Sequence, residues 1–184
     1  MLSAVTLAGC DSGGDDPVVS PTPTASSTSA SPSASSSPSP TPSSTGPDIP
    51  AAARQKTNAG AEAFVRFFFD QFNVAWTQPQ PGLIKALSDP ACQFCAKAES
   101  TAQYLNAHAQ RYQSVPSTLL TVDVFGGAPT GQQFTEIHLV QNAAKIVDSA
   151  GKVVDTDPRL DKRYYVTLKW AGDGWRLLEL EKTK

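Results

Sequence analysis

The first 50 residues of this 184-residue chain contain no aromatic residue, no lysine and no arginine. Their only charged side chains are four aspartates, which give this part a formal charge of −4. The remaining 134 residues hold all 15 basic residues and 13 of the 17 acidic ones, a net charge of +2. So weak a charge argues against nucleic acid as a partner, because its binding is dominated by clustered lysine and arginine on phosphates.

The chain also lacks a run of about 18 apolar residues, the length that a membrane-spanning helix needs. It contains no Gly-x-Ser-x-Gly nucleophile elbow, no His-Glu-x-x-His zinc motif and no phosphate-binding glycine loop. We therefore expect neither a metal nor a cofactor, and we favour a non-enzymatic protein over an enzyme.

The residues before the first cysteine are typical of an export signal. Residues 1–7 are largely apolar, and small residues precede a cleavage point in processed secretory signals. With the cysteine that follows, Leu7-Ala8-Gly9-Cys10 resembles the lipobox of bacterial lipoproteins. The resemblance implies cleavage before Cys10, a lipid such as palmitate on its thiol, and a location on the extracytoplasmic face of the cell membrane. Because this stretch is short and has no basic residue, we expect translation to begin upstream of Met1.

Serine, threonine, proline and alanine dominate the segment that follows. Between Pro17 and Pro47 there is no charge and no aromatic residue, so the segment cannot bury enough apolar surface to offset the entropy of ordering. Such a tract is typical of an O-glycosylated stalk or of a bare linker, and both alternatives stay open. We predict a signal segment over residues 1–9, a lipid-anchored disordered stalk over 10–54, and a domain over 55–184.

Apolar residues at helical spacing predict helices in the first half of the domain. One is expected over residues 58–77, ending before the Pro-Gln-Pro-Gly sequence at 79–82. A short helical piece follows at 83–87. The next helix is expected to begin at Asp89 as the N-cap, with Pro90 in its first position, and to continue to residues 111–113.

After Pro116 the apolar pattern changes to a period of two, which predicts strands. The first runs through Leu120, Val122 and Val124, and the second covers 134–142. A hairpin or sheet extension is expected around 146–154, and a final hairpin joins 163–170 to 175–181 across Ala-Gly-Asp-Gly. Helices followed by an antiparallel meander predict the α+β class, with N-terminal helices packed on a curved antiparallel sheet of about four strands.

This order of elements is similar to the cone-shaped fold of nuclear transport factor two and ketosteroid isomerase. Three segments also resemble an uncharacterised family of secreted actinobacterial lipoproteins: GAEAFVRFFFDQ at 60–71, LSDP with CQFC across 87–95, and FGGAP at 125–129. The resemblance covers about residues 55–183. It implies location and fold, and it carries no assigned activity.

Cys92 and Cys95 lie three residues apart on one face of the expected helix. In an exported chain we favour a structural disulfide between them. A redox pair stays open because a helix N-terminus lowers a thiol pKa, although the thioredoxin motif follows a strand. Free thiols and a zinc site also stay open, but zinc would need two more ligands, for which only His108 and His138 are available.

Five aromatic residues are candidates for lining a hydrophobic mouth of the cone. They are Phe67, Phe69, Tyr104, Tyr165 and Trp175. The alternative is that they complete the core. Such a mouth would suit a small lipophilic ligand or an envelope protein, and this binding role is the function we favour.

An envelope enzyme of isomerase-like or hydrolase-like type is the other hypothesis. The isomerases of this fold use a tyrosine and acidic groups, which Tyr104, Tyr112, Asp70 and Asp123 could supply, but nothing in the sequence aims them inward together. Glu136 and His138 alternate on one strand face, as a base with its carboxylate or as an exposed pair, and we favour the exposed pair.

We also expect His108 to be solvated. Asp155, Asp157 and Asp161 lack the glycine and the distal glutamate of a calcium loop, so we expect a solvated loop there.

Overall fold

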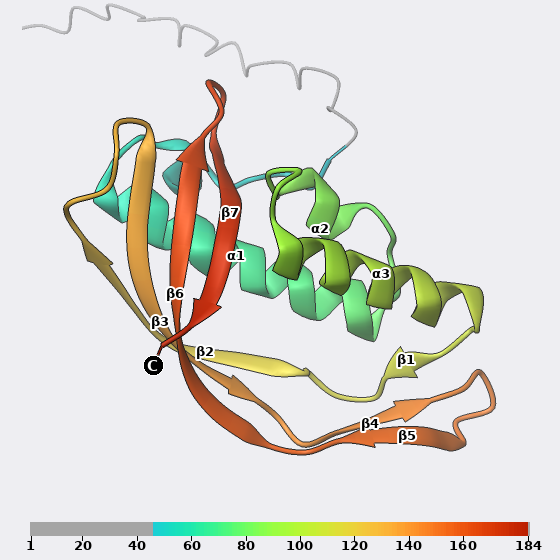
Figure 1. Cartoon of the computed structure of the whole chain (residues 1–184). Helices are drawn as coiled ribbons and strands as arrows, with labels where there is room; N and C mark the ends of the chain where they lie inside the picture. The colour runs from blue at the N-terminus through green and yellow to red at the C-terminus, as the bar shows by residue number, and fades with distance from the viewer. Residues whose placement is uncertain (1–45, 184) are drawn as a thin grey trace, which may run out of the picture. The chain divides into compact units, whose positions relative to one another are not determined.

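The computed structural model describes residues 46–183 (Figure 1). In chain order the elements are the 3-10 helix η1 (Ala51–Arg54), helices α1 (Asn58–Thr77), α2 (Leu83–Ala86) and α3 (Gln93–Ala107), and strands β1 (Arg111–Tyr112), β2 (Ser117–Phe125), β3 (Gln132–Gln141), β4 (Ala144–Val147), β5 (Val153–Asp157), β6 (Leu160–Trp170) and β7 (Trp175–Lys182). Helices precede an antiparallel meander, so the predicted α+β class is confirmed. The predicted signal segment, Cys10 and most of the predicted stalk lie outside the described residues.

The strands form two antiparallel sheets, one ordered β2-β3-β6-β7 and the other β1-β4-β5. Two residues separate β3 from β4, and two separate β5 from β6. The pairing continues across both gaps, since Gln141 pairs with Leu160 and Ala144 with Asp157. One long two-stranded ribbon therefore runs from the large sheet into the small one and bends between them, with α1 and α3 lying along the same side of it (Figure 1).

The core lies between α1 and the inner face of the large sheet. Phe64 and Phe68 of α1 are buried against a cluster that includes Ile137 of β3 and Leu168 of β6. Side chains alternate between the two faces of a strand, so the neighbours Glu136 and His138 lie on the outer face. The position of α1 thus decides which face of the sheet is inside.

Helix α1 has the predicted bounds. Thr57 is its N-cap, and its side chain accepts a hydrogen bond from the N–H of Gly60 at 3.0 Å. Helix α2 follows Gly82, which adopts a left-handed φ of 99°, a conformation that glycine takes without strain.

The predicted start of the next helix is wrong. Asp89 accepts a hydrogen bond from the N–H of Ala91 at 3.0 Å and so closes a turn instead of capping a helix. The N-cap of α3 is Cys92, whose Sγ accepts from the N–H of Cys95 at 3.1 Å.

The predicted end of α3 is also wrong. The helix stops at Ala107, and Ala109 takes a left-handed φ of 50°. The chain then becomes strand β1, in which Arg111 pairs with Val147 and Tyr112 with Ile146. Pairing with a strand distant in sequence overrides the helical periodicity at this point.

Strand β2 departs from the expected alternation. Leu119 pairs with Leu139 and Thr121 with His138, so Leu120 is an extra residue at a β-bulge. Leu120 is therefore exposed, whereas Val122 is buried. The three residues that the sequence grouped on one inner face do not share it.

Residues 46–54, which we expected in the stalk, pack onto the domain. Ala53 of η1 is fully buried and Ile49 packs against the core. The indole Nε1 of Trp175 donates to the carbonyl oxygen of Gln55 at 2.8 Å. The packed part of the chain therefore begins before residue 55.

Replacing Gly60 with alanine should destabilise the domain. Alanine usually stabilises a helix by about 1 kcal/mol over glycine, but a Cβ here would lie 2.0 Å from the carbonyl oxygen of Gln55. We expect Gly60→Ala to lower the free energy of unfolding by about 2 kcal/mol in urea titrations. The control is Gly126→Ala, where a Cβ would meet nothing within 4 Å. Equal stability of the two variants would contradict the close approach.

Candidate functional site: an apolar cavity at the bend of the ribbon

The five aromatic residues predicted to line a common mouth do not come together. Phe69 and Trp175 are buried in the core, and Phe67 packs against it. Tyr104 is exposed on α3, and Tyr165 is exposed on the outer face of the large sheet. None of the five lines the cavity described next.

A largely enclosed cavity of about 120 Å³ lies where α1 and α3 face the bend of the ribbon. Its walls are mostly apolar. The lining residues are Phe72, Trp76, Phe94, Pro116, Ser117, Leu139, Gln141, Asp157, Leu160, Tyr164 and Leu180.

Packed aromatic rings form one wall of the cavity. The ring centroids of Phe72 and Trp76 are 4.3 Å apart, and the ring of Phe72 stacks on that of Phe94 at 6.0 Å. The indole Nε1 of Trp76 donates to the carbonyl oxygen of Ala98 at 3.1 Å, which fixes the orientation of the ring. The rings of this wall are therefore positioned by one another and by a backbone hydrogen bond.

Four polar side chains line this apolar space: Ser117, Gln141, Asp157 and Tyr164. Ser117 Oγ already donates to Asn73 Oδ1 at 2.9 Å, and Gln141 Nε2 to the carbonyl oxygen of Pro158 at 3.2 Å. Burial raises the pKa of the Tyr164 phenol, so its hydroxyl stays protonated and can donate. No bond of this hydroxyl to another residue occurs within the described part of the chain. It is therefore available to a ligand.

Asp157 supplies the one carboxylate among the lining residues. One of its carboxylate oxygens accepts a hydrogen bond from the hydroxyl of Tyr112 at 2.5 Å. Burial of Tyr112, followed by this bond to Asp157, raises the pKa of the Tyr112 phenol far above its usual range. The Tyr112 proton is thus committed to Asp157, while the carboxylate keeps lone pairs for another donor.

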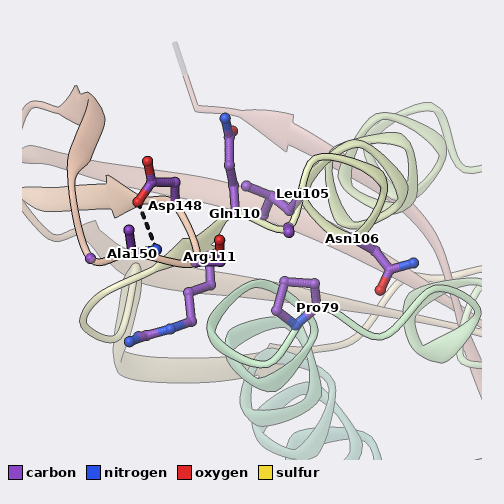
Figure 2. A pocket seen from close by; sticks show the side chains of 10 residues that line it. Pro79, Leu105, Asn106, Gln110, Arg111, Asp148 and Ala150 are labelled. Atoms are coloured by element: carbon purple, nitrogen blue, oxygen red, sulfur yellow. Dashed lines mark hydrogen bonds between the residues drawn. The ribbon is translucent and has the colours of Figure 1, made fainter.

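A more open hollow of about 470 Å³ is a weaker candidate (Figure 2). Its wall includes the turn around Asp148, whose carboxylate already accepts from the N–H groups of Ala150 and Lys152 at 3.0 and 2.9 Å. Figure 2 shows the Arg111 side chain extending away from Asp148. The polar side chains that line this hollow do not converge on a common point.

Glu136 and His138 have separate partners on β6. Glu136 pairs with Arg163 at 2.9 Å, and His138 Nε2 lies 2.6 Å from Asp161. The carboxylate of Glu136 therefore does not orient His138, and both side chains lie in cross-strand pairs on the outer face.

The structure joins Cys92 and Cys95 by a disulfide at the start of α3. Both residues are buried, which limits the access of an attacking thiolate. Over residues 46–183 no group of three or more His, Cys, Asp or Glu side chains is placed to hold a metal ion. In the same range no helix is long and apolar enough to cross a membrane.

Sequence reasoning missed Tyr164 and chose its neighbour. On β6 the buried residues Val166 and Leu168 are two and four positions beyond Tyr164, so a period of two places Tyr164 with them on the inner face. The same rule places Tyr165 outside. The period of two along β6 could have identified Tyr164, but only once the buried face of the strand is known.

Comparison with solved structures supports this architecture. The intermembrane-space region of the chloroplast protein ARC6 is similar, with a TM-score of 0.52 and 16% identity over 70% of this chain and 97% of that one. Looser likenesses are an uncharacterised protein with a cystatin-like fold from Caulobacter vibrioides (TM-score 0.41, 15% identity, 65% of this chain and 87% of that one) and the Kfla4162 protein from Kribbella flavida (TM-score 0.45, 12% identity, 68% and 91%). At 16% identity the likeness to the ARC6 region shows a shared fold alone.

The class is therefore that of α+β proteins in which helices cover a curved antiparallel sheet. Residues 33–181 match the model of DUF6318, a family of unknown function, and the chain belongs to that family. No curated protein matches it in sequence.

The Tyr112–Asp157 bond predicts a pH dependence of stability. The folded state holds the Tyr112 proton more tightly than the unfolded chain, where tyrosine titrates near 10.0. This stabilisation is present below that pH and is lost as the pH rises above it. Urea titrations from about pH 8 to about pH 11 should show the free energy of unfolding falling above about pH 10.

Two variants test the assignment. Tyr112→Phe should show a shallower fall, and Asp157→Asn, which keeps the burial but lacks the carboxylate, should lie between it and the wild type. A Tyr112→Phe profile identical to the wild type would contradict the assignment.

Proposed function

We propose that this chain is a lipid-anchored binding module on the extracytoplasmic face of the cell membrane, and that its cavity receives one apolar group of a ligand or partner protein. The observation that carries the binding role is a preformed apolar cavity lined by Tyr164, whose hydroxyl has no hydrogen-bond partner among the described residues.

The volume limits what can enter. Pockets for whole small molecules usually measure about 300–1,000 Å³, and the cavity has about 120 Å³. An apolar cavity of about 150 Å³ holds benzene. The cavity therefore suits one branched or aromatic side chain, with the rest of its carrier lying outside.

The polar groups define the orientation of that guest. The Tyr164 phenol can donate to a carbonyl, and the Asp157 carboxylate can accept from an N–H group. A peptide unit next to an apolar side chain offers both. This favours a protein segment with an exposed leucine-like or phenylalanine-like residue as the occupant.

The lipid anchor and the extracytoplasmic location are proposed from residues outside the described part of the chain. It rests on Leu7-Ala8-Gly9-Cys10, on the uncharged tract behind it, and on the resemblance to secreted actinobacterial lipoproteins. A tether of that kind would hold the cavity outside the cell, where envelope proteins are its available partners.

One observation favours a second function, that of an isomerase-like enzyme. Tyr164 and Asp157 border the same apolar space, and a phenol with a carboxylate is the pair needed to polarise a carbonyl and move an adjacent proton. Turnover of a small enolisable ketone, lost in both Tyr164→Phe and Asp157→Asn, would support the enzyme over the binding module.

Closing the cavity should abolish binding of an apolar guest. Leu160 is partly exposed and lines the cavity, so Leu160→Trp should fill it with little effect on folding. We expect the amides of N-acetyl-leucine and N-acetyl-phenylalanine to shift the NMR signals of cavity residues in the wild type and not in this variant. Tyr164→Phe should weaken the interaction about fivefold, the value of one hydrogen bond of ~1 kcal/mol.

Leu120→Trp is the matched control, because Leu120 is similarly exposed, lies at the bulge of β2 and is not among the residues that line the cavity. It should bind as the wild type does. Binding that survives Leu160→Trp would rule the cavity out as the site.

Lipidation at Cys10 can be tested separately. Protein that carries Cys10 behind an intact lipoprotein signal should incorporate labelled palmitate and fractionate with membranes. Cys10→Ala should remove the label and release the protein, whereas a double alanine variant of Cys92 and Cys95 should keep the label. If Cys10→Ala stays on the membrane, the anchor is elsewhere.

A further inference from the structure

Three aromatic rings lie in contact on the outer face of the large sheet. Phe125 of β2 is 39% exposed and Tyr165 of β6 is 47% exposed, and Phe134 of β3 lies between their strands. The ring centroid of Phe125 is 6.0 Å from that of Phe134 and 6.0 Å from that of Tyr165. We call these three residues the aromatic patch. Contiguous exposed rings of this kind mark interaction sites more often than single exposed residues do.

Carboxylates border the aromatic patch along the sheet. The strand register places Asp123 opposite Glu136, Glu136 opposite Tyr165, and Tyr165 opposite Glu181. We call Asp123, Glu136 and Glu181 the carboxylate row.

In the next row of the same face, Phe125 is opposite Phe134, Phe134 is opposite Thr167, and Thr167 is opposite Glu179. The aromatic patch therefore has acidic side chains on both sides of Tyr165 and at the β7 edge.

This arrangement costs stability in the isolated chain. Asp123 and Glu136 are directly opposite each other on adjacent strands, a position in which like charges repel. Arg163 compensates Glu136 alone, at 2.9 Å. Asp123 and Glu181 are exposed, and no salt bridge to them occurs among the described residues.

We infer that this outer face docks a cationic segment of a partner protein that also carries apolar side chains. Arginine and lysine complement the carboxylate row in charge, and they stack favourably on the face of a tyrosine or phenylalanine ring. Apolar side chains of the same segment would cover Phe125 and Phe134. The site lies on the opposite face of the sheet from the cavity and is independent of the proposed function.

Charge also argues against a second copy of the chain on this face. A face-to-face pair would bring two carboxylate rows together, and the cations of the same face, Arg163, Lys169, Arg176 and His138, already pair with carboxylates of their own chain. A cationic segment removes the repulsion that a second copy would increase.

The test measures binding of a short fluorescent peptide that alternates arginine with leucine to the full chain, by anisotropy. We expect saturable binding that weakens with salt, because exposed charge pairs are screened. Tyr165→Ala and Glu181→Lys should each raise the Kd about tenfold, equivalent to ~1.4 kcal/mol. Both residues are exposed, and unchanged urea unfolding would show that the variants fold.

Controls match each variant in type and exposure. Tyr104→Ala removes an exposed tyrosine of α3, and Asp70→Lys reverses an exposed acid of α1. Both should bind the peptide as the wild type does. Leu160→Trp should also leave this binding unchanged, so a failure of the cavity proposal would not affect this one.

Three results would overturn the inference. One is the absence of saturable binding, and another is an equal loss in Tyr104→Ala or Asp70→Lys. The third is concentration-dependent dimerisation in sedimentation experiments that Tyr165→Ala abolishes, since the face would then join two copies of the chain.

Discussion

The phenylalanine-rich face of α1 packs into the inner face of the large sheet, and this contact determines where the cavity lies. Phe64 and Phe68 are buried in one cluster with Ile137 of β3 and Leu168 of β6, and each such side chain contributes roughly 1.5–3 kcal/mol of hydrophobic stabilisation. The same helix face continues through Phe72 and Trp76. There the ribbon bends from one sheet into the other, so the helix surface is no longer fully covered and the apolar cavity opens beside it.

Strand β6 separates two surfaces of different character because consecutive side chains point to opposite faces. Tyr164 contributes a phenol to the cavity, and Tyr165 contributes an exposed ring to the aromatic patch. The cavity is small and mostly apolar, and the Tyr164 hydroxyl has no partner among the described residues. The outer surface carries the aromatic patch and the carboxylate row. A one-residue shift in register would exchange the two tyrosines, so the register of this strand matters to both proposals.

Local sequence signals predicted some elements well. Helix α1 was predicted at its observed bounds because a strong apolar period, a capping threonine and a proline-rich end all agree. The hairpin of β6 and β7 follows from its turn sequence. The prediction failed where local sequence signals compete with contacts between residues distant in sequence. Asp89 was predicted as a helix cap but closes a turn. The residues at the end of the expected helix form strand β1, which pairs with β4. The β-bulge at Leu120 could not be predicted, because the alternation of apolar residues in the sequence does not show it.

The amino-acid sequence by itself determined the division into an N-terminal tract without aromatic or basic residues and a domain with helices first and strands after. It did so because composition and apolar periodicity act over short stretches of chain. Only the tertiary structure decided that Phe69 and Trp175 complete the core, that Tyr164 borders a cavity with Asp157, and that Phe125, Phe134 and Tyr165 meet on the outer face. Those placements depend on strand register and on the bend of the ribbon. Both are set by contacts between residues far apart in sequence, which no short pattern encodes.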